Sequence, residues 1–149
     1  MSTQKVRSPA HRVIAALARV LLGVALFYAG LSHLTFARVE FLAQVPAWVP
    51  LDPDLVVVIS GIIEMILGIS LVFLWPYQSY VGWVVALFFI AIFPGNISQF
   101  LTQTDAFGLS TDLARGIRLL FQPLLVLWAL WCTQALSLLP SHKQRATPQ

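Results

Sequence analysis

Five polar side chains lie inside or at the ends of long apolar runs, and their chemical types suit the binding of a small polar group within a membrane. The five are His33, Glu64, Asn96, Arg118 and Gln122. A carboxylate can accept a proton, and guanidinium and amide groups donate hydrogen bonds to carbonyl oxygens. Ionisable residues are costly inside a bilayer and mark functional sites by default. We therefore take this set as the candidate ligand-binding or proton-handling site, with no metal site among its members.

The charged members of this set also have structural interpretations. Glu64 could be paired with Arg118 or Arg19 and serve only to hold helices together. His33 falls at the end of an apolar run, where a capping role is as plausible as ligand binding. Arg118 could extend to a lipid phosphate. Arg19, close to the opposite end of its run, is expected to extend toward the inner membrane surface, so it is left out of the candidate site.

The two amides carry the same ambiguity because each lies beside a proline. Asn96 follows Pro94, and Gln122 immediately precedes Pro123. A proline inside a helix removes one backbone hydrogen bond and frees a carbonyl four residues earlier, that of Ile90 in the case of Pro94. Asn96, Gln122 or a water molecule could satisfy the freed carbonyls, so either amide could repair the backbone and not bind a ligand.

Several kinds of chemistry are excluded by what the chain lacks. Cys132 is the only cysteine, so there is no C-x-x-C pair to exchange disulfides. The three histidines are His11, His33 and His142, and only His33 falls near the membrane interior, which excludes haem ligation by two histidines across a bundle. Neither an HExxH motif nor a phosphate-cradling loop is present. The sequence leaves open whether the chain is an enzyme, and no residue is assigned a catalytic role.

The elements that must position these residues are predicted to be membrane-spanning helices. Of the 149 residues, 58% are hydrophobic and 10% are charged, whereas a soluble domain carries about 25% charged residues. A helix needs roughly 20 apolar residues to cross a bilayer. Four runs meet this length, at about 13–34, 55–74, 80–100 and 116–139. The prediction is an all-α integral membrane four-helix bundle over residues 13–139, with polar cytoplasmic tails at 1–12 and 140–149.

The distribution of basic residues predicts that both ends of the chain are cytoplasmic. The flanks on the predicted inner side contain Lys5, Arg7, Arg12, Lys143 and Arg145. The opposite side holds fewer basic residues, and positive charge favours the cytoplasmic side. The external loop between the first two spans then contains VPAWVPLDPD, whose prolines forbid a continuous helix. Because the basic residues stand at the ends of apolar runs and form no patch, nucleic-acid binding is rejected.

Glycine spacing indicates which way Glu64 points. Gly23 and Gly30 in the first span, and Gly61 and Gly68 in the second, recur at helical intervals. Small residues at such spacing let helix backbones approach closely in lipid. Glu64 shares their face and is expected to point into the bundle. At 1.5 Å per residue it lies roughly 13 Å below the outer end of its span, and the five candidate residues converge in the outer half.

Five stretches resemble the DoxX-like family of small four-span bacterial membrane proteins. They are FYAGLSHL, VPAWVP, SGIIEMILGI, FPGNI and RLLFQPLLVLWALW, which occur in family order over roughly residues 17 to 131. The resemblance implies a four-helix bundle in the bacterial plasma membrane. The family's own positions fall on His33, Glu64, Asn96, Arg118 and Gln122.

The resemblance also implies a redox-associated role. Some members are associated with quinone-linked sulfur oxidation and others with membrane redox complexes, so a quinone is the ligand that the resemblance suggests. A partner redox protein or a homo-oligomer would then accompany the lipid bilayer as partners. The alternative is a non-enzymatic assembly subunit, or a carrier of small molecules, in which an intramembrane pair of Glu64 with an arginine is structural. The sequence does not name the substrate.

Overall fold

The four predicted spans are all present as long helices in the computed structural model, which describes residues 8–108 and 110–139. The long helices are α1 (Pro9–Leu34), α3 (Pro53–Phe73), α4 (Gln78–Leu101) and α5 (Asp112–Cys132), and the short elements are α2 (Arg38–Leu42) and two 3₁₀ turns, η1 (Trp75–Tyr77) and η2 (Ala135–Leu138). The described part of the chain contains no strand. Four helices are long and apolar enough to cross a membrane, as a multi-pass membrane protein requires, so the all-α prediction is confirmed.

Capping side chains explain where these helices begin. Ser8 accepts a hydrogen bond from the backbone N–H of His11, and Pro9 follows it at the first helical position. Because this is a strong start signal, α1 begins four residues before the predicted span, so residues 9–12 of the predicted tail are helical. The remaining residues of that tail, 1–7, lie outside the described part. Asp52 and Thr111 cap α3 and α5 in the same way.

The last helix ends at Cys132, seven residues before the predicted 139. Gln134 adopts a left-handed backbone conformation with φ of 56°, which stops the helix and leads into η2. The chain is then fastened to α4: Trp83 Nε1 donates to the carbonyl of Ala135 at 2.9 Å, and Ser79 Oγ donates to that of Thr133 at 3.2 Å. The hydrophobic pattern of the sequence did not reveal the end of α5, because the residues on both sides of that end are apolar. The predicted tail at 140–149 lies outside the described residues.

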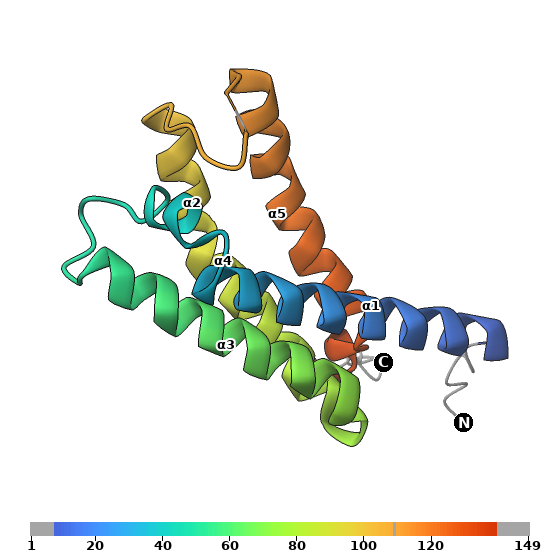
Figure 1. Ribbon diagram of the computed structural model, residues 1–149. Coiled ribbons are helices and arrows are strands. Elements are labelled where there is room, and N and C mark those ends of the chain that lie inside the picture. The colour runs from blue at the N-terminus through green and yellow to red at the C-terminus, as the bar shows by residue number, and fades with distance from the viewer. Residues whose placement is uncertain (1–7, 109, 140–149) are drawn as a thin grey trace, which may run out of the picture.

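Helices pack as two pairs, α1 with α3 and α4 with α5. Figure 1 shows α1 and α3 running along one another, while the outer ends of α4 and α5 lead away from them with α2 between. We call the end where α1 stops and α3 starts the outer end, and the end where α3 and α4 are joined the inner end. The two pairs therefore separate toward the outer end.

Glycines set the close contact within the first pair. A Cβ added at Gly23 would lie 2.8 Å from the carbonyl oxygen of Gly68, and one added at Gly68 would lie 2.5 Å from that of Gly23. Gly30 and Gly61 face one another in the same way, since a Cβ on Gly61 would lie 2.9 Å from the Gly30 oxygen. The predicted glycine contact is confirmed, and it fixes the register of the two antiparallel helices.

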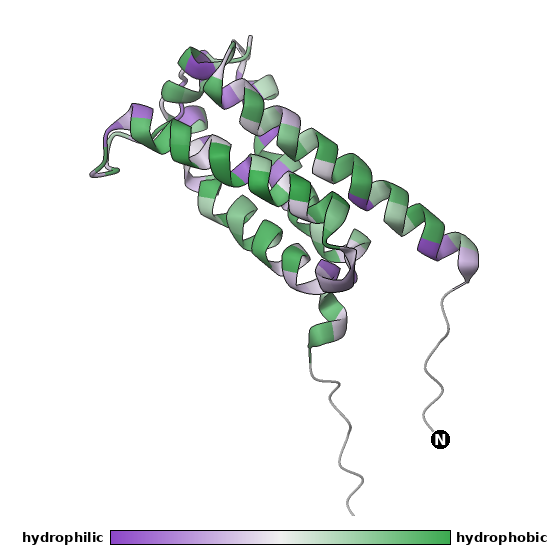
Figure 2. Ribbon diagram, turned by 60° about the horizontal axis from the view of Figure 1, so that its bottom comes forward, coloured by the Kyte–Doolittle hydropathy of each residue, from purple (hydrophilic) through white to green (hydrophobic). Residues whose placement is uncertain are grey.

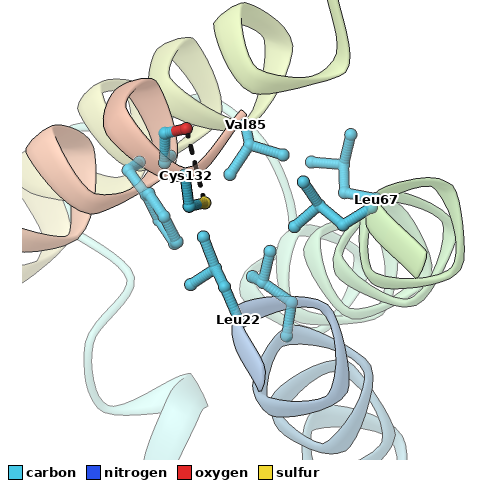
Figure 3. Packing of buried hydrophobic residues seen from close by; sticks show 8 residues of the cluster. Leu22, Leu67, Val85 and Cys132 are labelled. Atoms are coloured by element: carbon cyan, nitrogen blue, oxygen red, sulfur yellow. Dashed lines mark hydrogen bonds between the residues drawn. The ribbon is translucent and has the colours of Figure 1, made fainter. Parts of the chain in front are cut away.

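Apolar side chains hold the two pairs together toward the inner end. The buried cluster comprises Leu22, Leu26, Leu67, Leu71, Val85, Phe89, Ala129 and Cys132, drawn from all four long helices (Figure 3). Figure 2 shows that the long helices consist mostly of hydrophobic residues, with hydrophilic ones at the helix ends and at a few positions within them. Many of the apolar side chains are exposed. Leu17, Ile66 and Leu120, for example, are 65%, 57% and 71% exposed. An apolar exterior over four helices suits a lipid environment.

Candidate functional site

A cavity of about 470 Å³ lies between the two helix pairs in the outer half of the bundle. All five residues singled out from the sequence line it: His33 from α1, Glu64 from α3, Asn96 from α4, and Arg118 and Gln122 from α5. Four are buried and Arg118 is half-buried. Most of the remaining wall is apolar, with Leu26, Phe89 and Leu125 among its members. The separation of the pairs toward the outer end thus creates a hydrophobic space with polar groups on both sides.

Glu64 is paired with His33 across the contact of α1 and α3. His33 Nδ1 lies 2.7 Å from Glu64 Oε2, and both side chains are 7% exposed. The sequence alternatives, in which Glu64 pairs with Arg118 or Arg19, are not what the described residues show. Neither Nδ1 nor Oε2 makes a well-directed hydrogen bond within this part of the chain. The pair is a close contact of two titratable groups whose hydrogen-bonding capacity is incompletely used.

The glycine register explains why these two residues meet. Because Gly30 faces Gly61, the last turn of α1 stands beside the second and third turns of α3. A Cβ on Gly61 would lie 2.7 Å from the Cβ of His33, so the imidazole lies directly over this glycine. Side chains on a helix point toward its N-terminus, which for Glu64 is the outer end.

The two amides form a short hydrogen-bonded chain between α4 and α5. Asn96 Nδ2 donates to Gln122 Oε1 at 3.0 Å, and Gln122 Nε2 donates to the backbone carbonyl of Phe89 at 2.7 Å. Gln122 therefore bonds to a carbonyl of α4, but to that of Phe89 and not to that of Ile90, which Pro94 frees. Gln122 therefore has a structural contact, the hydrogen bond to a carbonyl of α4, and it also lines the cavity.

Loss of the Gln122 side-chain bonds should be measurable as lost stability. Gln122→Leu leaves the Phe89 carbonyl and the Asn96 amide buried without this partner, and we expect the free energy of unfolding to fall by about 2 kcal/mol. Equilibrium unfolding by SDS in mixed micelles, followed by circular dichroism, measures it. Leu124→Ala, at a site 57% exposed on the same helix, is the control and should change stability by less than about 0.5 kcal/mol. Equal effects of the two variants would contradict the assignment.

Arg118 connects the two outer loops to the cavity. Its Nη2 donates to Gln44 Oε1 at 3.0 Å, and its guanidinium lies 4.7 Å from the centre of the Phe107 ring. Gln44 belongs to the loop after α2, and Phe107 to the loop between α4 and α5. Guanidinium groups are attracted to aromatic faces in this arrangement. Arg118 therefore has partners within the protein and does not depend on lipid phosphate for them.

The segment after α1 covers the outer mouth of the cavity. Phe41, Gln44 and the loop residues 45, 46, 48 and 49 contribute to the lining. The Phe41 ring lies between that of His33, at 3.4 Å between centres, and that of Phe107, at 4.6 Å. Sequence reasoning missed Phe41 and Gln44, because α2 has only five residues and such a short helix has no readable periodicity.

Two polar contacts hold this covering segment in place. Glu40 Oε2 accepts a hydrogen bond from the backbone N–H of Phe107 at 2.5 Å. Arg38 pairs with Asp54 at the start of α3, and this hydrogen bond raises the pKa of the Arg38 guanidinium. The covering segment is thereby attached both to α3 and to the α4–α5 loop, and these contacts hold it over the cavity.

The cavity has the chemistry of a ligand site and no metal site. Among the described residues no group of three or more potential metal ligands is present. Arg115, on the same helix as Arg118, is engaged elsewhere and pairs with Asp105 and Asp112. The cavity instead offers a carboxylate beside an imidazole on one wall and amide and guanidinium donors on the other. Such a site can receive a largely apolar molecule that carries oxygen acceptors.

Comparison with known proteins gives a family and no activity. Comparisons with curated proteins and with solved structures each found no match. A family model matches residues 22–133, which include half of α1, the whole of the other three long helices and every residue of the five-membered site. The chain belongs to this family, which is described as a domain of unknown function (DUF8561).

Proposed function

We propose that this chain is a multi-pass protein of the bacterial plasma membrane, a redox-associated subunit of the DoxX-like type that binds a quinone-like small molecule in its cavity. The observation that carries the proposal is the cavity itself, an apolar space of about 470 Å³ whose two walls carry His33 with Glu64 and Asn96 with Arg118 and Gln122. The resemblance of the five sequence stretches to the DoxX-like family supports the same assignment.

The donor groups suit a flat ring with carbonyl oxygens. Each side-chain amide has two N–H groups, and Asn96 and Gln122 each use one of them within the protein. The guanidinium of Arg118 likewise has donors beyond the one that binds Gln44. The remaining donors are available to a ring oxygen, while Phe89 and Leu125 supply apolar contacts to the ring faces. An oxygen acceptor would thus be bound at the wall formed by α4 and α5.

The wall formed by α1 and α3 carries two groups that can exchange protons with a ligand, His33 and Glu64. Reduction of a quinone to its hydroquinone takes up two electrons and two protons. The electrons would come from a partner redox protein, and His33 and Glu64 would pass protons to the ring oxygens, since both groups titrate and lie 2.7 Å apart. In the reverse direction, when the hydroquinone gives up its electrons to the partner, Glu64 is the proton acceptor. His33 holds the carboxylate in place and completes the pair.

The proposal includes an orientation. The N- and C-terminal ends lie in the cytoplasm because the basic residues concentrate there, and the proline-rich loop and the mouth of the cavity face the other side. A reporter enzyme that is active only outside the cytoplasm, fused to the N-terminus, should be inactive. The same reporter inserted in the outer loop beside Gly108, which has open space around it, should be active. The reverse pattern would overturn the orientation.

Retention of a quinone tests the proposed function. Wild-type protein and Glu64→Gln are purified from membranes in mild detergent, and the extracted lipids are analysed by mass spectrometry. We expect quinone with the wild type and at least a roughly ten-fold smaller amount with the variant, equivalent to about 1.4 kcal/mol of binding free energy. Added quinone should also quench the fluorescence of Trp48, which lines the cavity. Ser70→Ala, on α3 outside the cavity lining, is the control and should retain the ligand.

One alternative has its own support. Because Glu64 and His33 neutralise one another at 7% exposure, they could serve only to join α1 and α3 in an assembly subunit or a small-molecule carrier. A protein partner recovered with both the wild type and Glu64→Gln, with quinone in neither, would favour this alternative and contradict the proposed function.

A further inference from the structure

Arg19 is a buried cation that the proposed function does not use. It lies on α1, is 6% exposed, and is not among the residues that line the cavity. Its Nε and Nη1 atoms are fully enclosed and have no hydrogen-bond partner within residues 8–108 and 110–139. The sequence predicted that Arg19 would extend toward the inner membrane surface, and the structure shows it 6% exposed. A buried guanidinium without a partner is strongly unfavourable, so its charge calls for a counter-ion.

No acidic side chain of this chain is placed to supply that counter-ion. The chain has six acidic residues: Glu40, Asp52, Asp54, Glu64, Asp105 and Asp112. All but Glu64 lie in α2, at the outer starts of α3 and α5, or in the outer loops, and Glu64 is paired with His33. Arg19 precedes His33 by fourteen residues on the same helix, a distance of roughly 21 Å along its axis. The counter-ion must therefore come from outside the chain's own carboxylate side chains.

The helix register places Arg19 at the level of a membrane surface. Gly23 faces Gly68, so Arg19, one turn closer to the inner end, stands beside the last turn of α3, which ends at Phe73. Trp75, Tyr77 and Tyr80 follow directly at 68%, 61% and 63% exposure. Exposed Trp and Tyr rings gather where lipid headgroups meet the hydrocarbon core. Arg19 is thus close to the phosphate layer of the leaflet at the inner end.

The neighbouring surface between α1 and α5 is polar in the same way. Trp128 Nε1 donates to the backbone carbonyl of Ala18, which brings α5 against α1 beside Arg19. Two turns before Arg19, His11 contacts the ring of Trp131 at 5.9 Å between centres, and its Nδ1 is also buried without a partner among the described residues. His11 and Arg19 of α1 thus each have enclosed nitrogen atoms without a partner among the described residues, and both lie where α1 meets α5.

We propose that Arg19 binds the phosphate group of an anionic phospholipid in the leaflet at the inner end, beside the contact of α1 with α5. Because Nε and Nη1 are enclosed, Nη2 is the guanidinium nitrogen left to donate to a phosphate oxygen, and the permanent charge of the guanidinium attracts the phosphate. A net negative lipid is favoured over a zwitterionic one because no acid of the chain lies at this end, whereas the basic residue Arg12 does. The site is independent of the cavity and of the proposed quinone.

Lipid retention in native mass spectrometry tests the inference. The full chain is delipidated in a neutral detergent and exposed in parallel to phosphatidylglycerol, phosphatidylcholine or inorganic phosphate. We expect bound phosphatidylglycerol on the wild type, at least about ten-fold less on Arg19→Gln, and an intermediate amount on Arg19→Lys. Arg12→Gln is the matched control, a basic residue on the same helix that is exposed, and should retain the lipid within about two-fold of the wild type.

The remaining outcomes separate the sources of the phosphate. If Arg19→Gln does not fold, thermal unfolding of the wild type tests the proposal instead. Phosphatidylglycerol should raise the midpoint of unfolding, and millimolar inorganic phosphate should not. Equal protection by inorganic phosphate would make the site one for a free anion and overturn the lipid assignment. Equal retention of phosphatidylcholine would overturn the preference for an anionic lipid, and undiminished retention by Arg19→Gln would overturn the role of Arg19. A loss of quinone in Glu64→Gln with lipid retention intact would show that the two sites are separate.

Discussion

Replacing His33 with leucine while Glu64 is retained is expected to destabilise the bundle by about 3 kcal/mol, because the carboxylate is left buried without its partner. The two atoms lie 2.7 Å apart and both side chains are 7% exposed, so the imidazole is the partner that the carboxylate loses in this variant. Unfolding by SDS in mixed micelles at neutral pH measures the change.

The double variant His33→Leu, Glu64→Leu is the control for this prediction. It removes both charges and should recover most of the lost stability, since replacing a buried pair by apolar side chains is often neutral or stabilising. Stability and ligand retention then give separate information. Recovered stability without bound quinone is the pattern expected of a functional pair, whereas a His33→Leu variant as stable as the wild type would show that the pair contributes nothing to the fold.

Replacing Gly68 with alanine is the second change from which we expect a large loss, about 3 kcal/mol in the free energy of unfolding. The new methyl would lie 2.5 Å from the carbonyl oxygen of Gly23 and 2.7 Å from the backbone nitrogen of Phe27. Backbone atoms cannot rotate away as a side chain can, so α1 and α3 must move apart and the packing between them is lost. Thermal unfolding in detergent, or the mixed-micelle assay, measures the effect.

Gly116→Ala on α5 is the matched control for Gly68→Ala. The nearest atom to its added methyl is Phe100 Cε2 at 3.7 Å, which is ordinary contact. Alanine is the better helix former, so this variant should be as stable as the wild type or more stable by about 0.5–1 kcal/mol. If Gly68→Ala and Gly116→Ala shift stability alike, the close contact of α1 and α3 does not hold the pair together.

What the sequence could predict was set by local periodicity. Runs of about 20 apolar residues identified four helices, and polar residues in those runs identified the five that line one cavity. Boundaries were less certain, because the start of α1 depends on the Ser8 cap and the end of α5 on the backbone of Gln134. Neither changes the hydropathy of its run.

Partners between helices could not be predicted from one sequence. Whether Glu64 meets His33, Arg118 or Arg19 depends on the register of α1 against α3, which the glycine contacts set over a long separation in the chain. The partner of Arg118 could not be predicted either, because Gln44 lies in a loop whose path is set by several weak contacts. The burial of Arg19 was not predictable either, since its place in the sequence is that of any basic residue near the end of a span.

The paired glycines of α1 and α3 carry a consequence for how the family can vary. Gly23 touches Gly68, and Gly30 touches Gly61, each through a backbone oxygen. A larger residue at one position would be tolerated only where the helix opposite shifts by a whole turn, which would also separate His33 from Glu64. Among relatives that retain the acid and the histidine, all four positions should stay small together, and relatives that lose the glycines should lose the pair as well.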